Sequence, residues 1–351
     1  MPVTRRALVA AAFQKPLSFS PPQPILADPS IHFGFPRLVR ARNGHLLCFY
    51  RVGNSHAYDH SSIELIRSPD SGRTWSARQK LWTDPDPDRS AHNPVALVTS
   101  SGRILLWMSG FRFRPNPQRR EPGLWTWSDD DGRTWRAPAV FDANPERSSY
   151  YMTDAIRTSD GLLAANATFP PGGVGNCHAV LWHAGGNGQW AVRSELTAPA
   201  ANRGDEVALL ETAPGQLLCL LRTRRQPGAK GYPPGLSRFI SGDGGRTWTE
   251  EENMGRMLGL TLQRPCLTRL DAQRVLLSGR NIETREVVAF VSFDNARTFT
   301  QRTVIQGYAK DGAYTSCLVI GVNEVLMVYY ADRDGALPDL YSTRLRIPSR
   351  A

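Results

Sequence analysis

The sequence predicts an all-β protein, a six-bladed β-propeller whose blades are four-stranded antiparallel sheets. Three observations support this. The 351 residues include 30 glycines and 26 prolines, an eight-residue motif recurs at nearly even spacing, and short apolar segments with strand character lie between its copies. Dense glycine and proline disfavour long helices and suit short strands joined by turns. Repeats of roughly 40 to 60 residues with such segments are typical of propellers.

The recurring octet reads SPDSGRTW at 68–75, SDDDGRTW at 128–135, SGDGGRTW at 241–248 and SFDNARTF at 292–299. A degenerate copy, HAGGNGQW, fills the long gap between the second and third copies, with Trp190 in register. The resulting spacings of 60, 55, 58 and 51 residues divide the chain into about six units. We therefore expect one domain over residues 1–351, with residues 1–13 as a disordered or targeting tail.

Each unit repeats the same order of strands. A first apolar strand leads through a turn to a second, and a third runs into the octet. The last unit ends in DLYSTRLRI without an octet, so closing the ring requires an outer strand from the N-terminus, within residues 14–27. The six first strands are expected at 35–41, 93–99, 154–159, 206–212, 264–270 and 314–320.

The charge composition favours an anionic ligand. The chain has 42 basic and 32 acidic residues, a net charge of +10, and its basic residues are almost all arginine. Arginine pairs bidentately with carboxylates and phosphates. The arginines are scattered, without a basic block or a reading helix, which disfavours nucleic-acid binding. No apolar run approaches the roughly 20 residues that span a bilayer, so we expect no membrane span.

The cysteines indicate neither a metal site nor a disulfide framework. There are 5, without C-x-x-C spacing, and we expect no metal and no cofactor. Four of them lie in apolar runs, which suits a reducing compartment. The N-terminal stretch MPVTRRALVAAAF carries a twin arginine, but its apolar core is at the short limit for a signal peptide. We therefore expect a cytoplasmic rather than an exported protein.

The octet resembles the Asp box, S-x-D-x-G-x-T-W, of sialidases and other BNR-repeat proteins. In that motif Asp and Ser cap a tight turn, Gly supplies a positive φ, and Trp inserts into the blade. Because these turns lie on the rim, we expect them to be structural. Chemistry is expected where the first strands begin around the axis. These positions are Gly34 to Arg37, His92-Asn93, Thr153-Asp154, Asp205-Glu206, Gln263-Arg264 and Ala313-Tyr314.

Two longer segments are similar to exo-sialidases, and the resemblance extends over essentially the whole chain. NRGDEVALLETAPGQLLCLLR, residues 202–222, resembles the segment in which a Glu begins an inner strand and an Arg ends the next strand. The family has a second Glu five residues after the first, and the matching residues here are Glu206, Glu211 and Arg222. DGAYTSCLVIGVNEVLMVYY, which starts at residue 311, resembles the family's Ala-Tyr-Ser segment and places Tyr314 on its nucleophile.

Other positions match less closely. Asp59 falls where the family has its acid/base aspartate, and Arg285 lies within one position of the third carboxylate-binding arginine. The family's first such arginine, in Arg-Ile-Pro, has no counterpart in Gly34-Phe35-Pro36. By period-two alternation, Arg37 points to the opposite face unless a bulge intervenes. Further candidate binding residues are Arg37, Arg264 and Arg51, the last two as substitutes for the missing arginine, and His92 as a hydrogen bonder in the channel wall.

The resemblance implies a retaining exo-glycosidase that hydrolyses a terminal acidic sugar, a sialic acid or a related ulosonic acid. Tyr314 would be the nucleophile, Glu206 its base and Asp59 the acid/base, with Arg222, Arg264 and Arg285 holding the sugar carboxylate. A phenol avoids the repulsion between an anionic nucleophile and that carboxylate. Two alternatives stay open: a non-catalytic propeller that binds acidic glycans, and a propeller lyase or hydrolase acting on uronic-acid glycans.

Overall fold

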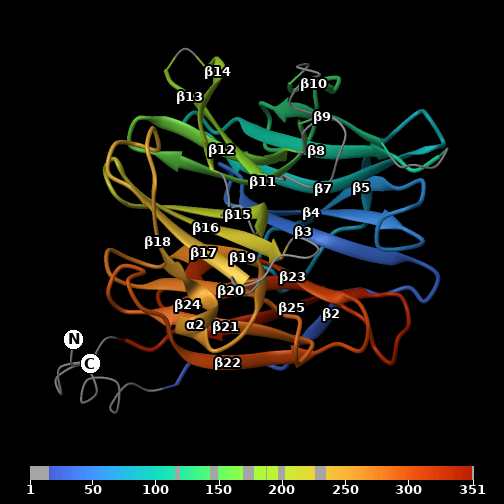
Figure 1. Cartoon of the computed structure of the whole chain (residues 1–351). Helices are drawn as coiled ribbons and strands as arrows, with labels where there is room; N and C mark the ends of the chain where they lie inside the picture. Colours follow the sequence, from blue (N-terminus) through green and yellow to red (C-terminus); the bar gives the residue numbers. More distant parts are fainter. Residues whose placement is uncertain are drawn as a thin grey trace, which may run out of the picture.

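The computed structural model describes residues 16–114, 119–142, 149–168, 178–186, 188–196, 202–225 and 235–349. Six antiparallel sheets follow one another in chain order, and the innermost strand of each contacts the innermost strands of the next and preceding sheets. The predicted six-bladed propeller is confirmed (Figure 1). The proposed tail, residues 1–13, and Cys177 lie outside the described residues, and the other four cysteines are free thiols.

Five blades are built from consecutive strands, ordered from the hub outward. Blade 1 consists of β3 (His32–Arg40), β4 (Leu46–Gly53), β5 (Ser62–Ser68) and β6 (Gln79–Thr83). Blade 2 consists of β7 (Arg89–Val98), β8 (Ile104–Arg112), β9 (Arg119–Ser128) and β10 (Ala139–Val140). Blade 3 consists of β11 (Ser149–Thr158), β12 (Gly161–Thr168), β13 (His178–Ala184) and β14 (Trp190–Leu196). Blades 4 and 5 consist of β15 (Asn202–Ala213), β16 (Gln216–Arg225), β17 (Gly235–Ser241), β18 (Thr249–Asn253); and β19 (Leu262–Arg269), β20 (Val275–Asn281), β21 (Glu286–Ser292), β22 (Thr300–Gly307).

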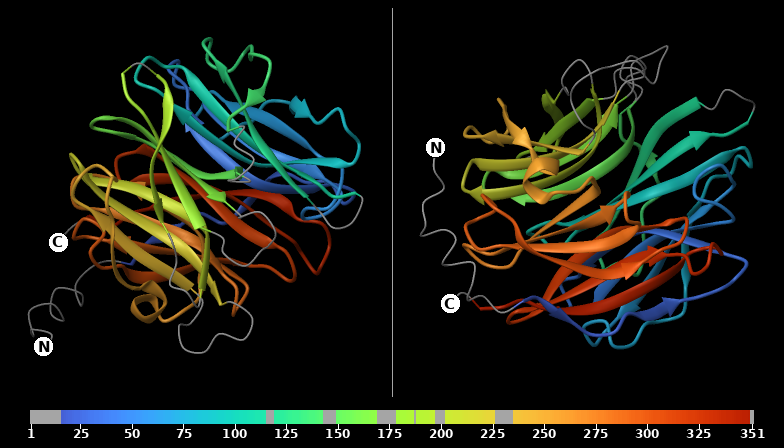
Figure 2. Two further views of the ribbon diagram at one scale, coloured as in Figure 1. Left: turned by 45° about the horizontal axis from the view of Figure 1, so that its top comes forward. Right: turned by 60° about the horizontal axis from the view of Figure 1, so that its bottom comes forward.

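The sixth blade joins the two ends of the chain. Its inner strands are β23 (Gly312–Gly321), β24 (Glu324–Ala331) and β25 (Asp339–Arg346). Two short N-terminal strands, β1 (Ser18–Phe19) and β2 (Gln23–Leu26), pair antiparallel with β25 and complete it. Figure 2 shows these blue strands against the red last blade. The predicted closure by residues 14–27 is confirmed.

A single-turn helix, α2 (Met254–Leu258), connects blades 4 and 5. Within the described ranges, the structure has no helix with the length and hydropathy needed to cross a membrane.

The hydrophobic core is divided among the gaps between blades. Six clusters of buried apolar side chains are present in the described residues, and each lies between two neighbouring blades. The cluster between blades 6 and 1, for example, joins Phe33 and Tyr50 to Val328 and Leu340. Because both faces of a blade are covered in this way, its strands are apolar on both faces. Polar side chains are consequently concentrated at strand ends, at the rim and at the hub.

The four octets that contain the Ser, Asp and Thr of the motif form the same turn, closed by the same hydrogen bonds. In the first copy, Ser68 Oγ donates to Asp70 Oδ1 at 2.8 Å and accepts from the N–H of Gly72 at 2.7 Å. Asp70 also accepts from the N–H and the hydroxyl of Thr74, at 2.8 and 2.6 Å. Every copy joins the third strand of a blade to the fourth, on the rim. The set repeats in the octets that begin at Ser128, Ser241 and Ser292.

The degenerate copy occupies the equivalent position in blade 3, between β13 and β14. It has no aspartate; instead Gly188, at φ 71°, donates its N–H to the carbonyl of Gly185 at 2.9 Å. Trp190 packs edge-on against Trp107 of blade 2, with 5.5 Å between ring centroids. This copy therefore has the tryptophan that packs between blades but not the aspartate that caps the turn.

The octet aspartates should make the fold sensitive to acid. Hydrogen bonds from the threonine hydroxyl and N–H hold the pKa of Asp70, Asp130 and Asp243 well below its usual range. A carboxyl whose pKa is lower in the folded state contributes stability above its unfolded pKa, and that stability is lost as the pH falls through the folded pKa. We expect the melting temperature to decrease as the pH is lowered below about 4. In the variant with all three aspartates replaced by asparagine, this decrease should be smaller. Thermal unfolding by circular dichroism measures both, and parallel curves would contradict the prediction.

Candidate active site

A β-bulge interrupts each of the six innermost strands near its leading end. The shifts in register fall at 34–37, 92–95, 152–154, 204–207, 263–266 and 312–315. Phe35, Asn93 and Arg264 have φ values of 56°, 42° and 47° there, in the left-handed region. A bulge releases a residue from the ladder and re-aims its side chain. The positions expected to converge at the axis are thus the six bulges.

Tyr314 and Glu206 meet across the hub, from blades 6 and 4. The Tyr314 hydroxyl donates to Oε1 of Glu206 at 2.7 Å, and Nη1 of Arg222 donates to Oε2 at 2.6 Å. All three side chains are buried. Burial and the negative charge of Glu206 raise the pKa of Tyr314. The phenol therefore keeps its proton at rest, and an acceptor for that proton is already bonded to it.

Two further guanidinium groups lie against the Tyr314 ring. Cζ of Arg264 is 5.6 Å and Cζ of Arg280 is 5.1 Å from the ring centroid. Arg280 is held by Gln263 Oε1, at 2.9 Å from Nη2, and by the Gly312 carbonyl, at 2.8 Å from Nη1. Together with Arg222, these groups make the surroundings of the phenol strongly cationic.

Sequence reasoning missed Arg280, although the repeat contains a signal for it. Arg51, Arg222 and Arg280 stand near the ends of the second strands of blades 1, 4 and 5. The register pairs Arg51 with Gly34 and Arg280 with Gln263, next to the bulges. Aligning the blades with one another would have found it. The sequence analysis instead selected Arg285, because its distance from the fourth octet matches that of an arginine in the resembled family. Arg285 is exposed and donates to the Ala309 carbonyl.

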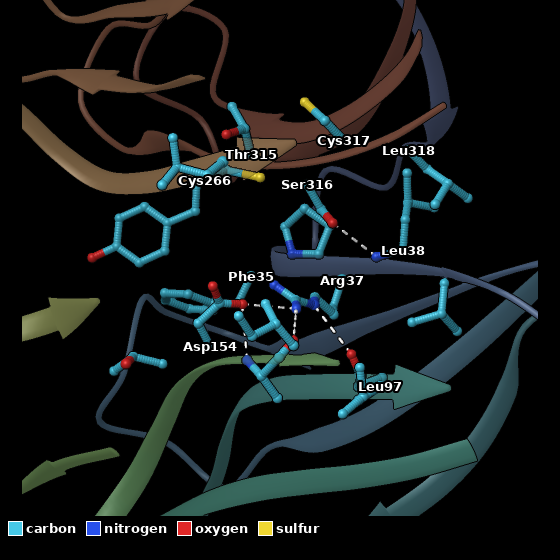
Figure 3. A pocket seen from close by; sticks show the side chains of 18 of the residues that line it. Phe35, Arg37, Leu38, Leu97, Asp154, Cys266, Thr315, Ser316, Cys317 and Leu318 are labelled. Carbon is cyan, nitrogen blue, oxygen red and sulfur yellow. Dashed lines mark hydrogen bonds and ion pairs between the residues drawn. The ribbon is translucent and has the colours of Figure 1, made fainter. Parts of the chain in front are cut away.

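Arg37 reaches the hub because of the bulge that precedes it. Its Nη2 donates to Oδ1 of Asp154 at 2.8 Å, so it is paired with an aspartate of blade 3 rather than grouped with Arg222. Figure 3 shows this ion pair at the cavity in the hub. The cavity measures about 300 Å³ and runs along the inner strands of five blades, with Tyr314 and Arg264 in its wall. Phe35 also lines the cavity, whereas Glu206, Arg222 and Arg280 are not among its lining residues.

Arg51 and Asp59 form a structural pair. Arg51 is fully buried, and its Nη2 donates to Oδ1 of Asp59. Oδ2 of Asp59 accepts from the N–H groups of Asn54 and Ser55. Both carboxylate oxygens are thus bonded to donors that hold the loop between β4 and β5. In this structure Arg51 does not face the phenol as the substitute arginine that the sequence suggested.

A second polar cluster lies beside the site, where the resembled family has its first arginine. Nε2 of His32 is 2.7 Å from Oδ2 of Asp311, and Nδ1 of His56 is 3.0 Å from the same oxygen. A Cβ on Gly34 would lie only 2.9 Å from Cε1 of His32. The His32 ring therefore occupies the space that a longer side chain at position 34 needs. Burial lowers the pKa of His32; burial also opposes ionisation of Asp311, yet both imidazole contacts hold the pKa of Asp311 below its usual range.

The ligand atoms of His32, His56 and Asp311 lie within 4.8 Å of one another, a spacing that suits a metal ion. The surroundings fit hydrogen bonding better. A metal-bound histidine donates its second N–H to an acceptor, whereas Nδ1 of His32 is buried without a hydrogen-bond partner among the described residues. We therefore treat the cluster as a carboxylate that accepts hydrogen bonds from two imidazoles.

His92 lies beside the same loop. Its Nε2 is 3.0 Å from the backbone carbonyl of His56, and its ring packs on Phe35 with centroids 4.2 Å apart. The contact fixes the backbone of the loop that carries His56.

Comparison with known proteins agrees with this architecture. The chain is 25% identical over 260 residues to a sialidase of Bacteroides fragilis and 23% identical over 241 residues to one of Paraclostridium sordellii. These matches cover 66% and 62% of this chain but 45% and 57% of the relatives, so the chain spans about half of their length. No protein-family model matches the sequence.

Solved structures show the same fold. A protein of unknown function from Dyadobacter fermentans superposes with a TM-score of 0.80 at 18% identity, covering 94% of this chain and 99% of that one. A Hadza microbial sialidase gives 0.71 at 19% identity, covering 89% of this chain and 65% of that one. The chain is thus similar in sequence to these sialidases, and its fold is that of the sialidase-type six-bladed propellers.

Proposed function

We propose that the protein is a retaining exo-glycosidase that hydrolyses a terminal acidic sugar, a sialic acid or a related ulosonic acid. The observation that carries the proposal is the buried hydrogen bond of 2.7 Å between the Tyr314 hydroxyl and Glu206. A binding module has no need for a base on a buried phenol. The relatives called sialidases support this class of substrate.

The geometry assigns a task to each group. Glu206 takes the phenol proton as Tyr314 attacks the anomeric carbon, so charge develops only in the transition state. Arg222 stays on the other oxygen of Glu206 and keeps that carboxylate oriented. Arg264 and Arg280 flank the phenol and would hold the sugar carboxylate in charge-assisted hydrogen bonds. Arg285, which is exposed in the turn between β20 and β21, stays a predicted further contact.

The test is a panel of fluorogenic glycosides of sialic acid, of its deaminated and shorter ulosonic relatives, and of uronic acids. We expect hydrolysis of at least one ulosonic glycoside, and the anomer first released, followed by NMR, to retain the configuration of the substrate. Binding without turnover across the panel would favour the glycan-binding alternative. An unsaturated product absorbing in the ultraviolet would favour the lyase.

A further inference from the structure

The loop between β4 and β5 places a partly exposed imidazole at the edge of the site. The side chain of His56 is 44% exposed. Its Nδ1 lies 3.1 and 3.0 Å from the two oxygens of Asp311, three residues before Tyr314 in the chain. Among the described residues no protein group is bonded to the opposite ring nitrogen, Nε2. An imidazole held by a carboxylate on one nitrogen and open on the other is the usual arrangement of a proton-transfer group.

His56 and Tyr314 lie at the same place in the hub. Both rings pack edge-on against Phe35, the bulge residue of blade 1, with centroid distances of 5.1 Å for His56 and 5.2 Å for Tyr314. The phenol and the imidazole thus contact the same ring and border the same part of the hub. Retaining glycosidases need a nucleophile and an acid/base in this relation.

Asp59 is badly placed for proton transfer. Its oxygens accept from Arg51 Nη2 and from two backbone N–H groups. Both oxygens therefore already serve as acceptors in the contacts that hold the loop. The pair formed by Arg51 and Asp59 instead fixes the loop that carries His56.

We propose that His56 is the acid/base of the reaction, with Asp311 as its positioning residue and Asp59 as a brace for the loop. The inference rests on the proposed glycosidase function. His32 donates to the same carboxylate from the buried side, which leaves His56 as the imidazole open to the site. The charged and titratable groups around His56 are Asp311, His32 and His92, with the Arg51–Asp59 pair on its own loop.

The proton transfers balance over two steps. In the first, Tyr314 Oη bonds to the anomeric carbon and loses its proton to Glu206, while protonated His56 gives a proton from Nε2 to the leaving glycosidic oxygen as that bond breaks. In the second, water attacks the anomeric carbon and gives one proton to His56. The bond to Tyr314 breaks, and Glu206 returns the proton to the phenol.

The test compares His56→Gln with Asp59→Asn on one acidic sugar carrying either an alkyl or an activated aryl leaving group. An alkoxide needs protonation to leave, whereas an activated phenolate does not. We expect His56→Gln to lose about 10²-fold or more in kcat/KM on the alkyl glycoside but little on the aryl glycoside. On the aryl glycoside, whose first step needs no acid, azide should replace the water that His56 activates in the second step, raise kcat and yield a glycosyl azide. Asp311→Asn should show a weaker form of the same leaving-group dependence.

Each other outcome overturns the inference. If Asp59→Asn shows the leaving-group dependence and the azide rescue, the aspartate is the acid/base. If His56→Gln raises KM equally for both substrates, without rescue, His56 only binds the sugar. Failure of the proposed function looks different: wild type then cleaves neither substrate. Circular dichroism of each variant establishes that it is folded.

Discussion

Tyr314→Phe is expected to abolish turnover of the acidic glycoside that wild type cleaves, with kcat falling by roughly 10³-fold or more. The substitution removes the one oxygen that is bonded to Glu206, at 2.7 Å, and leaves the ring in place. The ring contacts with Phe35, Arg264 and Arg280 persist, so we expect the substrate to bind with nearly unchanged affinity. Steady-state kinetics and calorimetric binding measure the two effects.

Tyr330→Phe is the matched control. The Tyr330 ring lies 5.8 Å from that of Tyr314 and is also buried, but its hydroxyl has no hydrogen-bond partner among the described residues. Removing an unsatisfied buried hydroxyl is neutral or stabilising, so this variant should keep wild-type activity. Equal loss in both variants would show that the inner cluster tolerates no change, and undiminished activity in Tyr314→Phe would reject the nucleophile.

Glu206→Gln is expected to cost about 3 kcal/mol of unfolding free energy in addition to activity, because it removes a negative charge that is hydrogen-bonded to the buried Arg222 cation. The ion pair is 2.6 Å long, and its side chains are only 7% and 3% exposed. Asp205 approaches Nε of Arg222 no closer than 3.9 Å and compensates only in part. Urea unfolding of wild type and variant measures the difference.

Glu211→Gln provides the control on the same strand. Glu211 is only partly buried, and accepts from Ser159 of blade 3 and from the Gly215 N–H. An amide keeps one acceptor oxygen there, so a loss of about 1 kcal/mol is expected, with activity unchanged. Equal destabilisation by the two substitutions would contradict a special cost for the buried pair.

The architecture could be predicted from the sequence because its repeated turns are specified by residues that are close together in the chain. Each octet holds its capping Ser, Asp and Thr within seven residues, and the hydrogen bonds of the turn stay inside that window. The strand starts were predicted two to five residues late, as at residue 35 against His32 in β3 and residue 206 against Asn202 in β15. The bulges interrupt the period-two pattern, and the pattern was followed only from the bulge onward.

The site was predictable in part. Tyr314, Glu206 and Arg264 come together because each stands at the same level of its own blade, which the repeat reveals, and Arg222 joins them from the second strand of blade 4. The surroundings of Asp59 were not predictable in this way. The polar loop NSHAYDH offers several titratable side chains, and their directions depend on Asp311, 255 residues further along the chain from His56.

The six bulges have an evolutionary consequence. A residue released from the ladder contributes no inter-strand hydrogen bond, so its replacement leaves the pairing of its blade unchanged. The equivalent bulge positions of this one chain already hold six different residue types: phenylalanine, asparagine, threonine, glutamate, arginine and tyrosine. The ligand specificity of such a hub can change by substitution at one bulge position at a time, while the rim turns and the packing between blades keep the fold intact.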